Sequence, residues 1–523
     1  MNTYLGQKGY TIPKNELTLE QQKSIRQSLT IEPFVMGAPV NGAKSYPIYR
    51  ESPNKFYVPH YYGIENFGPP KEYKISNGSD IDLTFNGKLR ENQEIVVNTY
   101  IDHVLKVGFG GGLLELPCAY GKTVLSLNII SRLKKKTFII VHKEFLMNQW
   151  IERIEQFLPG ARIGKIQGPI VDIDDKDIVI GMLQSLSMKD YPASTFDSFG
   201  LTIIDEVHHI SSEVFSNALF KLVTKYMLGL SATMNRKDGT TPVFKMFLGD
   251  IIFKGKRDEE RAVTVRAIQY CVDDEEFNEV KYDYRGNPQY STMISKLCEY
   301  NHRSEFILKV LSDMLNDNPN QQIMILAHNK NLLKYLHDAI AHRNIATVGY
   351  YVGGMKESAL KETESKKVVI ATYAMAAEAL DIKTLTTLIM ATPKTDIEQS
   401  VGRILREKHS SPVVVDIVDS HQLFRNQWTK RKTFYKRENY KITFITSVNY
   451  NNNRDYANWK IVYNPKPDGS KECKPKKSKN DLSKKSNSST DKSISESSDE
   501  EDEPEMSSNN DKYVSEVCFL KIK

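Results

Sequence analysis

The chain has 523 residues, of which 40% are hydrophobic and 26% charged. This composition is typical of a globular protein and excludes a wholly disordered or fibrous chain, and the length suggests about three domains. No stretch approaches the roughly 18 consecutive apolar residues of a membrane span, and the first fifteen residues, MNTYLGQKGYTIPKN, contain no hydrophobic signal core. We therefore expect an intracellular protein of a reducing compartment, with no membrane contact.

Charge and cysteine content limit the kinds of partner and metal site that we expect. The five cysteines lie at least 27 residues apart, so there is no C-x-x-C pair and we expect no structural zinc. The net charge is +6, and two blocks near the end, Lys466–Lys492 at +5 and Ser493–Asp511 at −8, leave +9 for the rest. A basic body is compatible with a polyanionic partner, and also with an ordinary lysine-rich surface.

The chain divides into regions of different pattern. Residues 1–82 are rich in Pro, Gly, Tyr and Asn, with one helix-like segment over 17–30 that opens with Thr18, which predicts a small accessory domain of irregular α+β character. Short β-branched runs alternate with amphipathic segments over 83–257 and again over 301–465. Both series predict an α/β lobe with a parallel sheet, joined by a linker or insert over 258–300. Residues 466–523 are too poor in apolar surface to fold, so we expect a mostly disordered tail.

The segment LPCAYGKT has the parts of a phosphate-binding loop and lies between an apolar run and a helical one. Such a loop needs backbone N–H groups around a phosphate, a lysine that reaches its oxygens and a hydroxyl for Mg²⁺. Leu116 replaces the first glycine of the full motif, and a bare GKT tripeptide also occurs by chance. The predicted cofactor-binding loop consists of Pro117, Cys118, Ala119, Tyr120, Gly121, Lys122 and Thr123.

Two adjacent carboxylates, Asp205 and Glu206, follow the apolar run Leu201–Ile204. At the carboxyl edge of a parallel sheet they would lie where phosphate-bound Mg²⁺ sits. We predict that Asp205, with Thr123, holds the metal and that Glu206 polarises the attacking water. The alternative is a helix N-terminus, where the helix dipole favours acidic residues.

Two further groups of residues are also candidates for a nucleotide site. Ser231-Ala232-Thr233 ends another strand pattern, so its small hydroxyl side chains can relay contacts from the nucleotide to a neighbouring lobe. In the second series, Gln399, Arg403 and Arg406 have the spacing i, i+4, i+7 of one helix face. Arginines from a separate lobe can neutralise charge on a transferring γ-phosphoryl group. The alternative is a solvated basic face.

In this order and spacing, these residues resemble the superfamily 2 helicases and translocases of the DExH type, over about Leu83 to Tyr440. The resemblance implies two tandem RecA-like lobes, with ATP and Mg²⁺ as cofactors and nucleic acid as the partner. It implies that Arg90 and Gln93 read adenine, and that Asp381, in the fifth motif, contacts the ribose of ATP. His142–Trp150 and Met182–Ser185 would grip a strand. The residues implied to contact nucleic acid or to couple it to ATP are His208, Ser231, Ala232, Thr233, Arg236 and Thr372.

Within the superfamily the chain is most similar to XPB-like DNA translocases and to poxvirus-type transcript-release helicases of large DNA viruses. LPCAYGKT, LGLSATMNRKDG and QSVGRILRE carry this similarity. It implies action on duplex DNA in transcription or transcript release, with an RNA polymerase or transcription complex as a candidate partner. The location would be the host cytoplasm, a viral factory or the virion, with the nucleus left open. Ala119, Ala379 and Lys237 depart from the family pattern.

Three alternatives remain open. An RNA helicase would carry the same motifs, because phosphate contacts do not distinguish the sugars. A weakened ATPase that serves as a nucleic-acid-binding transcription scaffold is suggested by Ala119 and Ala379. The basic, aromatic segment Arg425–Lys441 either binds a strand or packs Trp428, Phe434 and Tyr435 on the second lobe.

Overall fold

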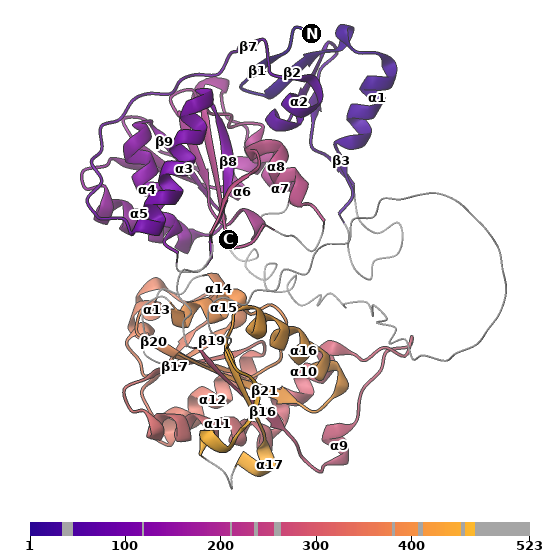
Figure 1. The fold of residues 1–523 in the computed structure, drawn as a ribbon, viewed down its shortest axis with the longest axis vertical. Coiled ribbons are helices and arrows are strands. Elements are labelled where there is room, and N and C mark those ends of the chain that lie inside the picture. Colours follow the sequence, from indigo (N-terminus) through magenta and orange to yellow (C-terminus); the bar gives the residue numbers. More distant parts are fainter. Residues whose placement is uncertain are drawn as a thin grey trace, which may run out of the picture.

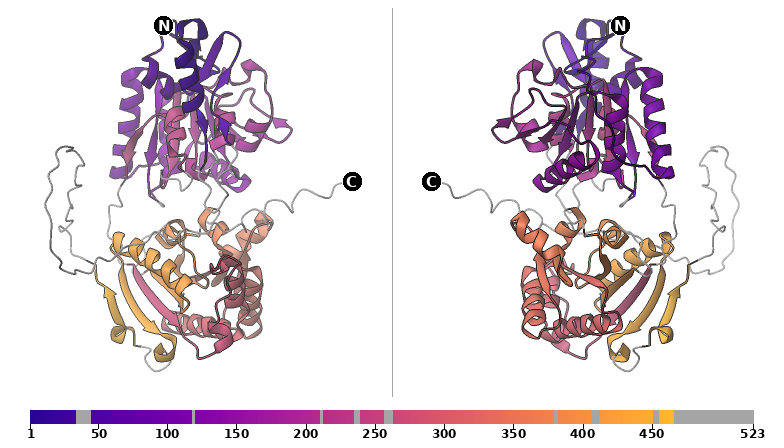
Figure 2. Two further views of the ribbon diagram at one scale, coloured as in Figure 1. Left: turned by 90° about the vertical axis from the view of Figure 1, so that its right-hand side faces the viewer. Right: turned by 90° about the vertical axis from the view of Figure 1, so that its left-hand side faces the viewer.

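The fold is described from a computed structural model, in which two α/β bodies lie one above the other (Figures 1 and 2). The structure describes residues 1–33, 45–117, 120–209, 212–234, 239–255, 263–378, 382–405, 412–450 and 455–465. The predicted tail, 466–523, lies outside the described residues. So do five predicted site residues, which are Cys118, Ala119, Arg236, Asp381 and Arg406.

The N-terminal region forms a five-stranded sheet above the first lobe (Figure 1). Its strands, in spatial order, are β5 (Arg50–Glu51), β6 (Lys55–Val58), β2 (Gly9–Pro13), β1 (Tyr4–Gly6) and β7 (Glu72–Tyr73). Helices α1 (Leu19–Ser28) and α2 (His60–Phe67) pack on one face, and a short pair, β3 (Thr30–Ile31) and β4 (Tyr46–Pro47), follows α1. Thr18 caps α1 in a reciprocal capping box with Gln21. One hydrophobic cluster joins this region to the first lobe, for example Ile12 and Phe56 with Phe244.

The first lobe is an eight-stranded sheet that is parallel except for one edge hairpin. Its order is β11 (Ile170–Val171), β10 (Ile163–Gln167), β12 (Ile178–Met182), β9 (Thr137–Val141), β13 (Leu201–Ile204), β14 (Tyr226–Ser231), β8 (Gly110–Glu115) and β15 (Ile251–Lys254). Its helices are α3 (Glu91–Val107), α4 (Lys122–Leu133), α5 (Glu144–Phe157), α6 (Leu183–Met188), α7 (Ser212–Leu219) and α8 (Thr241–Leu248). Separate hydrophobic clusters cover the two faces, so the central strands are buried on both sides, as their apolar runs predict.

The second lobe repeats this plan (Figure 1). Its order is β18 (Val348–Tyr351), β19 (Val368–Thr372), β17 (Gln322–Ala327), β20 (Leu385–Met390), β21 (Val413–Asp419), β16 (Thr264–Tyr270), β22 (Lys441–Thr446) and β23 (Lys460–Tyr463), with only the β22–β23 pair antiparallel. The helices are α9 (Glu275–Asn278), α10 (Tyr290–Glu299), α11 (Asn301–Asp317), α12 (Lys330–His342), α13 (Glu357–Glu364), α14 (Tyr373–Glu378), α15 (Glu398–Gly402), α16 (Gln422–Arg437) and α17 (Ser447–Tyr450). The predicted fold class, two tandem α/β lobes with mostly parallel sheets, is confirmed.

The prediction of a linker over 258–300 is wrong for part of that range. Strand β16 lies inside the second sheet, paired in parallel with β21 on one side and β22 on the other. The sequence TVRAIQY has the β-branched and alternating character of a strand, but the charged residues around it concealed this pattern. The second sheet therefore begins at Thr264.

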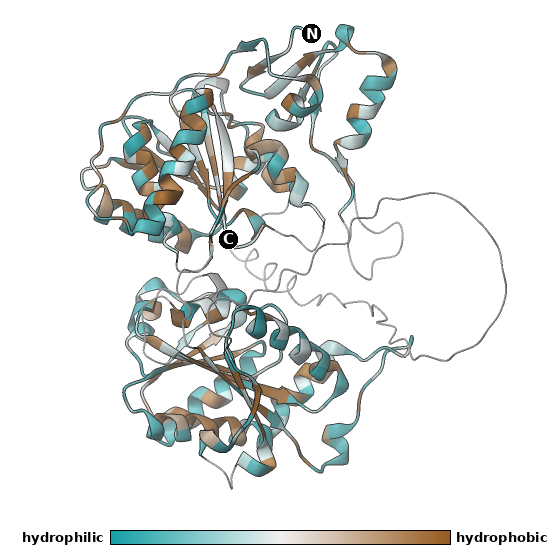
Figure 3. Ribbon diagram, viewed as in Figure 1, coloured by the Kyte–Doolittle hydropathy of each residue, from teal (hydrophilic) through white to brown (hydrophobic). Residues whose placement is uncertain are grey.

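The basic helix α16 packs on the second lobe through its aromatic residues. Trp428 and Tyr435 are buried, and Arg431 is buried in an ion pair with Asp416, with Nε 2.8 Å from Oδ2. These contacts favour the packing interpretation of Arg425–Lys441 for the inner face of the helix. In both lobes the helices have a hydrophobic side and a hydrophilic side (Figure 3).

Candidate functional site at the edge between the lobes

The predicted phosphate-binding loop connects β8 with α4. Gly121 is the N-cap of α4 with a φ of 89°, and Lys122 is the first residue of the helix. Glycine suits this left-handed conformation because it has no Cβ, and a Cβ here would lie 2.4 Å from Nε2 of Gln93. The N-terminus of α4, where backbone N–H groups and the helix dipole favour anions, therefore lies at the carboxyl edge of the first sheet.

Arg90 and Gln93, the predicted adenine-reading pair, both contact this loop. Gln93 Nε2 donates to the carbonyl oxygen of Tyr120 at 2.8 Å, and Arg90 Nη2 donates to the same oxygen at 2.6 Å. Gln93 Oε1 accepts from the backbone N–H of Arg90 at 3.0 Å. The fold thus brings both residues to the loop, and their role toward adenine remains a prediction.

The two carboxylates lie beside the loop lysine. Lys122 Nζ donates to Glu206 Oε1 at 2.7 Å, which joins positions 84 residues apart in the sequence. Glu206 has a φ of 50°, an uncommon conformation for a side chain of this size, directly after β13. A 3-10 turn, Val207–His209, follows it directly, so the two carboxylates precede a 3-10 turn and not a regular α-helix.

Asp205 is held from two sides inside the lobe. Trp150 Nε1 donates to Asp205 Oδ2 at 2.9 Å, and the backbone N–H of Glu206 donates to Asp205 Oδ1 at 2.9 Å. Burial and, after it, the charge of Glu206 together raise the pKa of Asp205 to about 6, against the opposing effects of Lys122 and these hydrogen bonds. A buried carboxylate with a raised pKa gains from a nearby cation.

These residues fit a nucleotide-bound magnesium ion. Mg²⁺ usually takes one or two carboxylates and completes its shell with water and phosphate oxygens. Asp205, and Thr123 at the start of α4, would hold the ion here. The described part of the chain contains no cluster of three or more His, Cys, Asp or Glu side chains that could hold a metal ion.

His208 connects the carboxylates to the second lobe. Its Nδ1 lies 2.6 Å from Ser231 Oγ and 3.4 Å from Glu206 Oε2, and its Nε2 lies 2.9 Å from Nε2 of Gln399. With the Gln399 amide donating to Nε2, the ring proton is on Nδ1 and is donated to Ser231. Ser231 Oγ in turn accepts from the backbone N–H of Thr233 at 3.2 Å, and Ala232 between them is buried.

The second lobe contributes Gln399 from α15, but the predicted helix face is only partly correct. The α-helix ends at Gly402, and Arg403 begins a 3-10 turn that extends to Leu405. Gln399 and Arg403 are therefore not on one regular helix. Thr372 lies at the carboxyl end of β19, where its Oγ1 accepts from the backbone N–H of Met375 at 3.4 Å.

Contacts between α5 and α13, which no sequence motif indicates, join the lobes beside the site. Asn148 Nδ2 of α5 donates to Glu357 Oε2 of α13 at 2.9 Å, and Lys361 Nζ of α13 lies 2.9 Å from Glu152 Oε1 of α5. Phe145 packs against clusters of both lobes. Because these partners are about 200 residues apart, no local signal could have found them. Trp150, the partner of Asp205, was named only as part of a strand-gripping segment.

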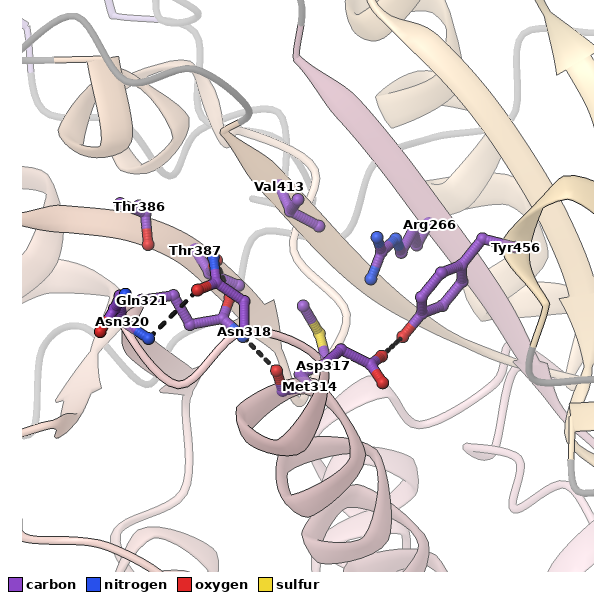
Figure 4. Close-up of a pocket in the computed structure, with 10 residues that line it drawn as sticks. All are labelled: Arg266, Met314, Asp317, Asn318, Asn320, Gln321, Thr386, Thr387, Val413 and Tyr456. Carbon is purple, nitrogen blue, oxygen red and sulfur yellow. Dashed lines mark hydrogen bonds between the residues drawn. The ribbon is translucent and has the colours of Figure 1, made fainter.

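A cavity of about 470 Å³ lies elsewhere in the second lobe (Figure 4). The Arg266 guanidinium stacks 3.4 Å from the centre of the Tyr456 ring, and the Tyr456 hydroxyl donates to Asp317. None of the predicted site residues lines this cavity, so it is separate from the site between the lobes. Among the described helices, none is long and apolar enough to cross a membrane.

Comparisons with known proteins find relatives of this chain among viral helicases. Residues 86–236 match the family described as "Type III restriction enzyme, res subunit". The chain is 35% identical, over 83% of its length and 85% of the relative, to "Putative ATP-dependent RNA helicase L396" of Acanthamoeba polyphaga mimivirus. It is 26% identical, over 69% of its length and 85% of the relative, to "Putative helicase 161L" of Invertebrate iridescent virus 6.

More distant matches are of the same kind. The chain is 27% identical, over 65% of its length and 71% of the relative, to "Putative ATP-dependent RNA helicase QP509L" of African swine fever virus. Among solved structures, it aligns with the Hef helicase domain of Pyrococcus furiosus at 12% identity and a TM-score of 0.45, over 66% of this chain and 98% of that one. On the strength of the mimivirus relative, the chain belongs to the superfamily 2 helicases, which are enzymes that hydrolyse ATP and act on nucleic acid.

Proposed function

We propose that the chain binds ATP and Mg²⁺ at the edge between its lobes and uses hydrolysis to move along a nucleic acid. The observation that carries this proposal is the convergence of Lys122, Asp205 and Glu206 with Gln399 of the other lobe through His208. When bound, Mg·ATP supplies the transferable γ-phosphoryl group and a divalent charge. Every other role belongs to side chains of this chain.

The ion pair between Lys122 and Glu206 makes the base depend on the nucleotide. While Lys122 donates to Glu206 at 2.7 Å, the ammonium charge makes the carboxylate a weaker base toward water. Phosphate oxygens at the N-terminus of α4 compete for the ammonium group, and Glu206 is then released to orient water. The residue that binds the substrate thereby also controls the residue that activates water.

His208 lies where it can report this change to the second lobe. It contacts Glu206 and Ser231 on one side and Gln399 on the other, so a shift of Glu206 alters a hydrogen bond between the lobes. Arg403 directly follows α15 and is the candidate to neutralise γ-phosphoryl charge on closure, together with Arg406, which lies outside the described residues. Opening and closing of the lobes would then drive stepping.

For the substrate, we propose duplex DNA during viral-type transcription or transcript release, with an RNA polymerase or transcription complex as partner. The support is the resemblance of LPCAYGKT, the Ser231–Thr233 region and QSVGRILRE to XPB-like translocases. Arg236, which this proposal places against DNA, lies outside the described residues.

A second candidate is an ATP-dependent RNA helicase. Two relatives, from mimivirus and African swine fever virus, carry that activity in their names. The motor residues contact phosphates and cannot by themselves choose between the sugars.

One experiment tests both proposals. Steady-state ATP hydrolysis is measured with no polynucleotide, duplex DNA, single-stranded DNA and RNA, for the wild type, Lys122→Ala and Glu206→Gln. We expect stimulation by duplex DNA that weakens as salt rises, and a loss of orders of magnitude in both variants. Stimulation by RNA at least equal to that by duplex DNA would replace the DNA proposal. Normal turnover in either variant would refute the ATPase site, and no hydrolysis in the wild type would leave the scaffold alternative.

A further inference from the structure

The five-stranded N-terminal sheet has one covered face and one open face. The side chains that pack against α1 and α2 are those of Leu5, Tyr10, Ile12, Phe56 and Val58. Direct pairing of Tyr4 with Thr11, and of Thr11 with Tyr57, places these three residues in one row across β1, β2 and β6. Paired residues of antiparallel strands point to the same side, so this row lies on the opposite, open face. In the part of the chain that the structure describes, the core cluster takes no residue from the row.

The open face carries two tyrosine rings, and lysine ammonium groups lie over both of them. Lys74 Nζ lies 4.7 Å from the centre of the Tyr4 ring, and Lys8 Nζ lies 5.4 Å from the centre of the Tyr57 ring. Lys55 Nζ lies 5.3 Å from the Tyr4 ring and donates to its hydroxyl at 3.2 Å. Both rings are half-buried, whereas Lys8 and Lys74 are exposed.

One strand separates the two tyrosines. Tyr4 and Tyr57 flank the central strand β2, so at about 4.8 Å per strand their Cα atoms are roughly 10 Å apart. Thr11 between them is small and buried. Because lysine side chains are flexible, bases can displace the ammonium groups from the rings and stack there, while the lysines neutralise the neighbouring phosphates.

The open face borders the first lobe near the end of helix α6. Arg50 extends the row beside Tyr57, and its guanidinium lies 5.2 Å from the ring of Phe220 in the first lobe. Burial lowers the pKa of Arg50, and the carboxylate of Asp190, two residues beyond the end of α6, raises it. Helix α6 begins within the predicted segment Met182–Ser185. The Arg50 end of the open face is therefore adjacent to the C-terminal end of α6.

We propose that the open face of the N-terminal sheet binds single-stranded nucleic acid, with bases stacked on Tyr4 and Tyr57 and phosphates beside Lys8, Lys55 and Lys74. This site goes beyond the proposed motor, because binding here needs neither ATP nor closure of the lobes. Stacking is tolerant of base and sugar, so single-stranded DNA and RNA are two arms of one test.

The test measures binding of the full chain, without nucleotide, to labelled single strands of increasing length and to a blunt duplex by fluorescence anisotropy. Tyr4→Ala/Tyr57→Ala should weaken binding of the longest strands by about tenfold or more, and leave the shortest strands and the blunt duplex unchanged. Tyr4→Phe/Tyr57→Phe keeps the rings and should retain binding. Tyr284→Ala removes a tyrosine that is 89% exposed in the second lobe and serves as the matched control.

A lysine variant tests the phosphate contacts separately. Lys8→Gln, Lys55→Gln and Lys74→Gln combined should reduce the slope of log K against log salt by about 2 for long single strands, since each neutralised phosphate contributes about 0.7. Basal ATP hydrolysis should be unchanged in every variant.

The proposal would be overturned if both the alanine and the lysine variants bound single strands as tightly as the wild type does. So would equal loss of duplex and single-strand binding, or a loss in the alanine variant that the phenylalanine variant shares. A different result would contradict the motor proposal, namely that no nucleic acid stimulates ATP hydrolysis by the wild type. That result would not affect the binding measurements described here for the N-terminal sheet.

Discussion

Replacement of Asp205 by asparagine should stabilise the first lobe at pH 8 while abolishing ATP hydrolysis. Burial raises the pKa of Asp205 to about 6, from an ordinary value near 4. A shift of about two units corresponds to roughly 3 kcal/mol that the folded state loses when it carries this carboxylate ionised. Asparagine is neutral at every pH and removes that cost.

Part of the gain is offset by a hydrogen bond. The two carboxylate oxygens accept from Trp150 Nε1 and from the backbone N–H of Glu206. Asparagine has one carbonyl oxygen, so one donor then faces an amide NH₂ group, which costs about 1–2 kcal/mol. The net expectation for Asp205→Asn is a gain of about 1–2 kcal/mol in the unfolding free energy at pH 8.

The sign of this effect reverses with pH. Between about pH 4 and pH 6, the folded wild type keeps a proton on Asp205 that the unfolded chain has lost, so its stability falls as pH rises through this window. The variant lacks this dependence. Below pH 4, where Asp205 is neutral in both states, the variant should be the less stable protein by the lost hydrogen bond.

Hydrogen exchange of the amides in β13 and α5 measures the difference in stability between the variant and the wild type, because it reports the local unfolding free energy of one lobe. ATP hydrolysis is assayed in parallel, and it should be lost because a neutral amide cannot supply the charge that Mg²⁺ requires. A destabilised variant at pH 8, or a difference from wild type that does not change with pH, would refute the electrostatic reasoning.

Three other changes have definite expectations. Arg403→Ala should reduce turnover by on the order of 10³-fold while nucleotide binding is largely kept, which stopped-flow and binding assays separate; equal losses would mark a structural arginine. Arg303→Met leaves the fully buried Asp419 carboxylate without its ion pair and should lower the unfolding free energy of the second lobe by about 3–5 kcal/mol in denaturant unfolding. Arg303→Met/Asp419→Leu should recover most of this stability. A double variant as unstable as the single variant would contradict this expectation. Deletion of residues 466–511 should leave the melting temperature and basal hydrolysis nearly unchanged, and a large drop in melting temperature would show that the tail packs on the body.

Elements that depend on a short, local sequence pattern could be predicted from the amino-acid sequence alone. Runs such as Leu201–Ile204 are apolar throughout because a central parallel strand is buried on both faces. The GKT tripeptide and the Asp205-Glu206 pair follow such runs, and carboxyl ends of parallel strands share one edge, so their convergence could be predicted. The capping box of α1 is equally local, since Thr18 and Gln21 are one turn apart.

The tertiary structure alone decided which partners these residues have. Lys122 reaches Glu206, Trp150 holds Asp205, and His208 bridges to Gln399, through contacts between positions 55 to 191 residues apart. Strand β16 joined the second sheet because β21 and β22 provide hydrogen-bonding edges on both sides of it, which no pattern within Thr264–Tyr270 reveals. Likewise, Tyr4 and Tyr57 share a face only because β2 pairs with both of their strands. Pairing of distant segments depends on the closure of long loops and on the packing of the whole core, and a local sequence pattern contains neither.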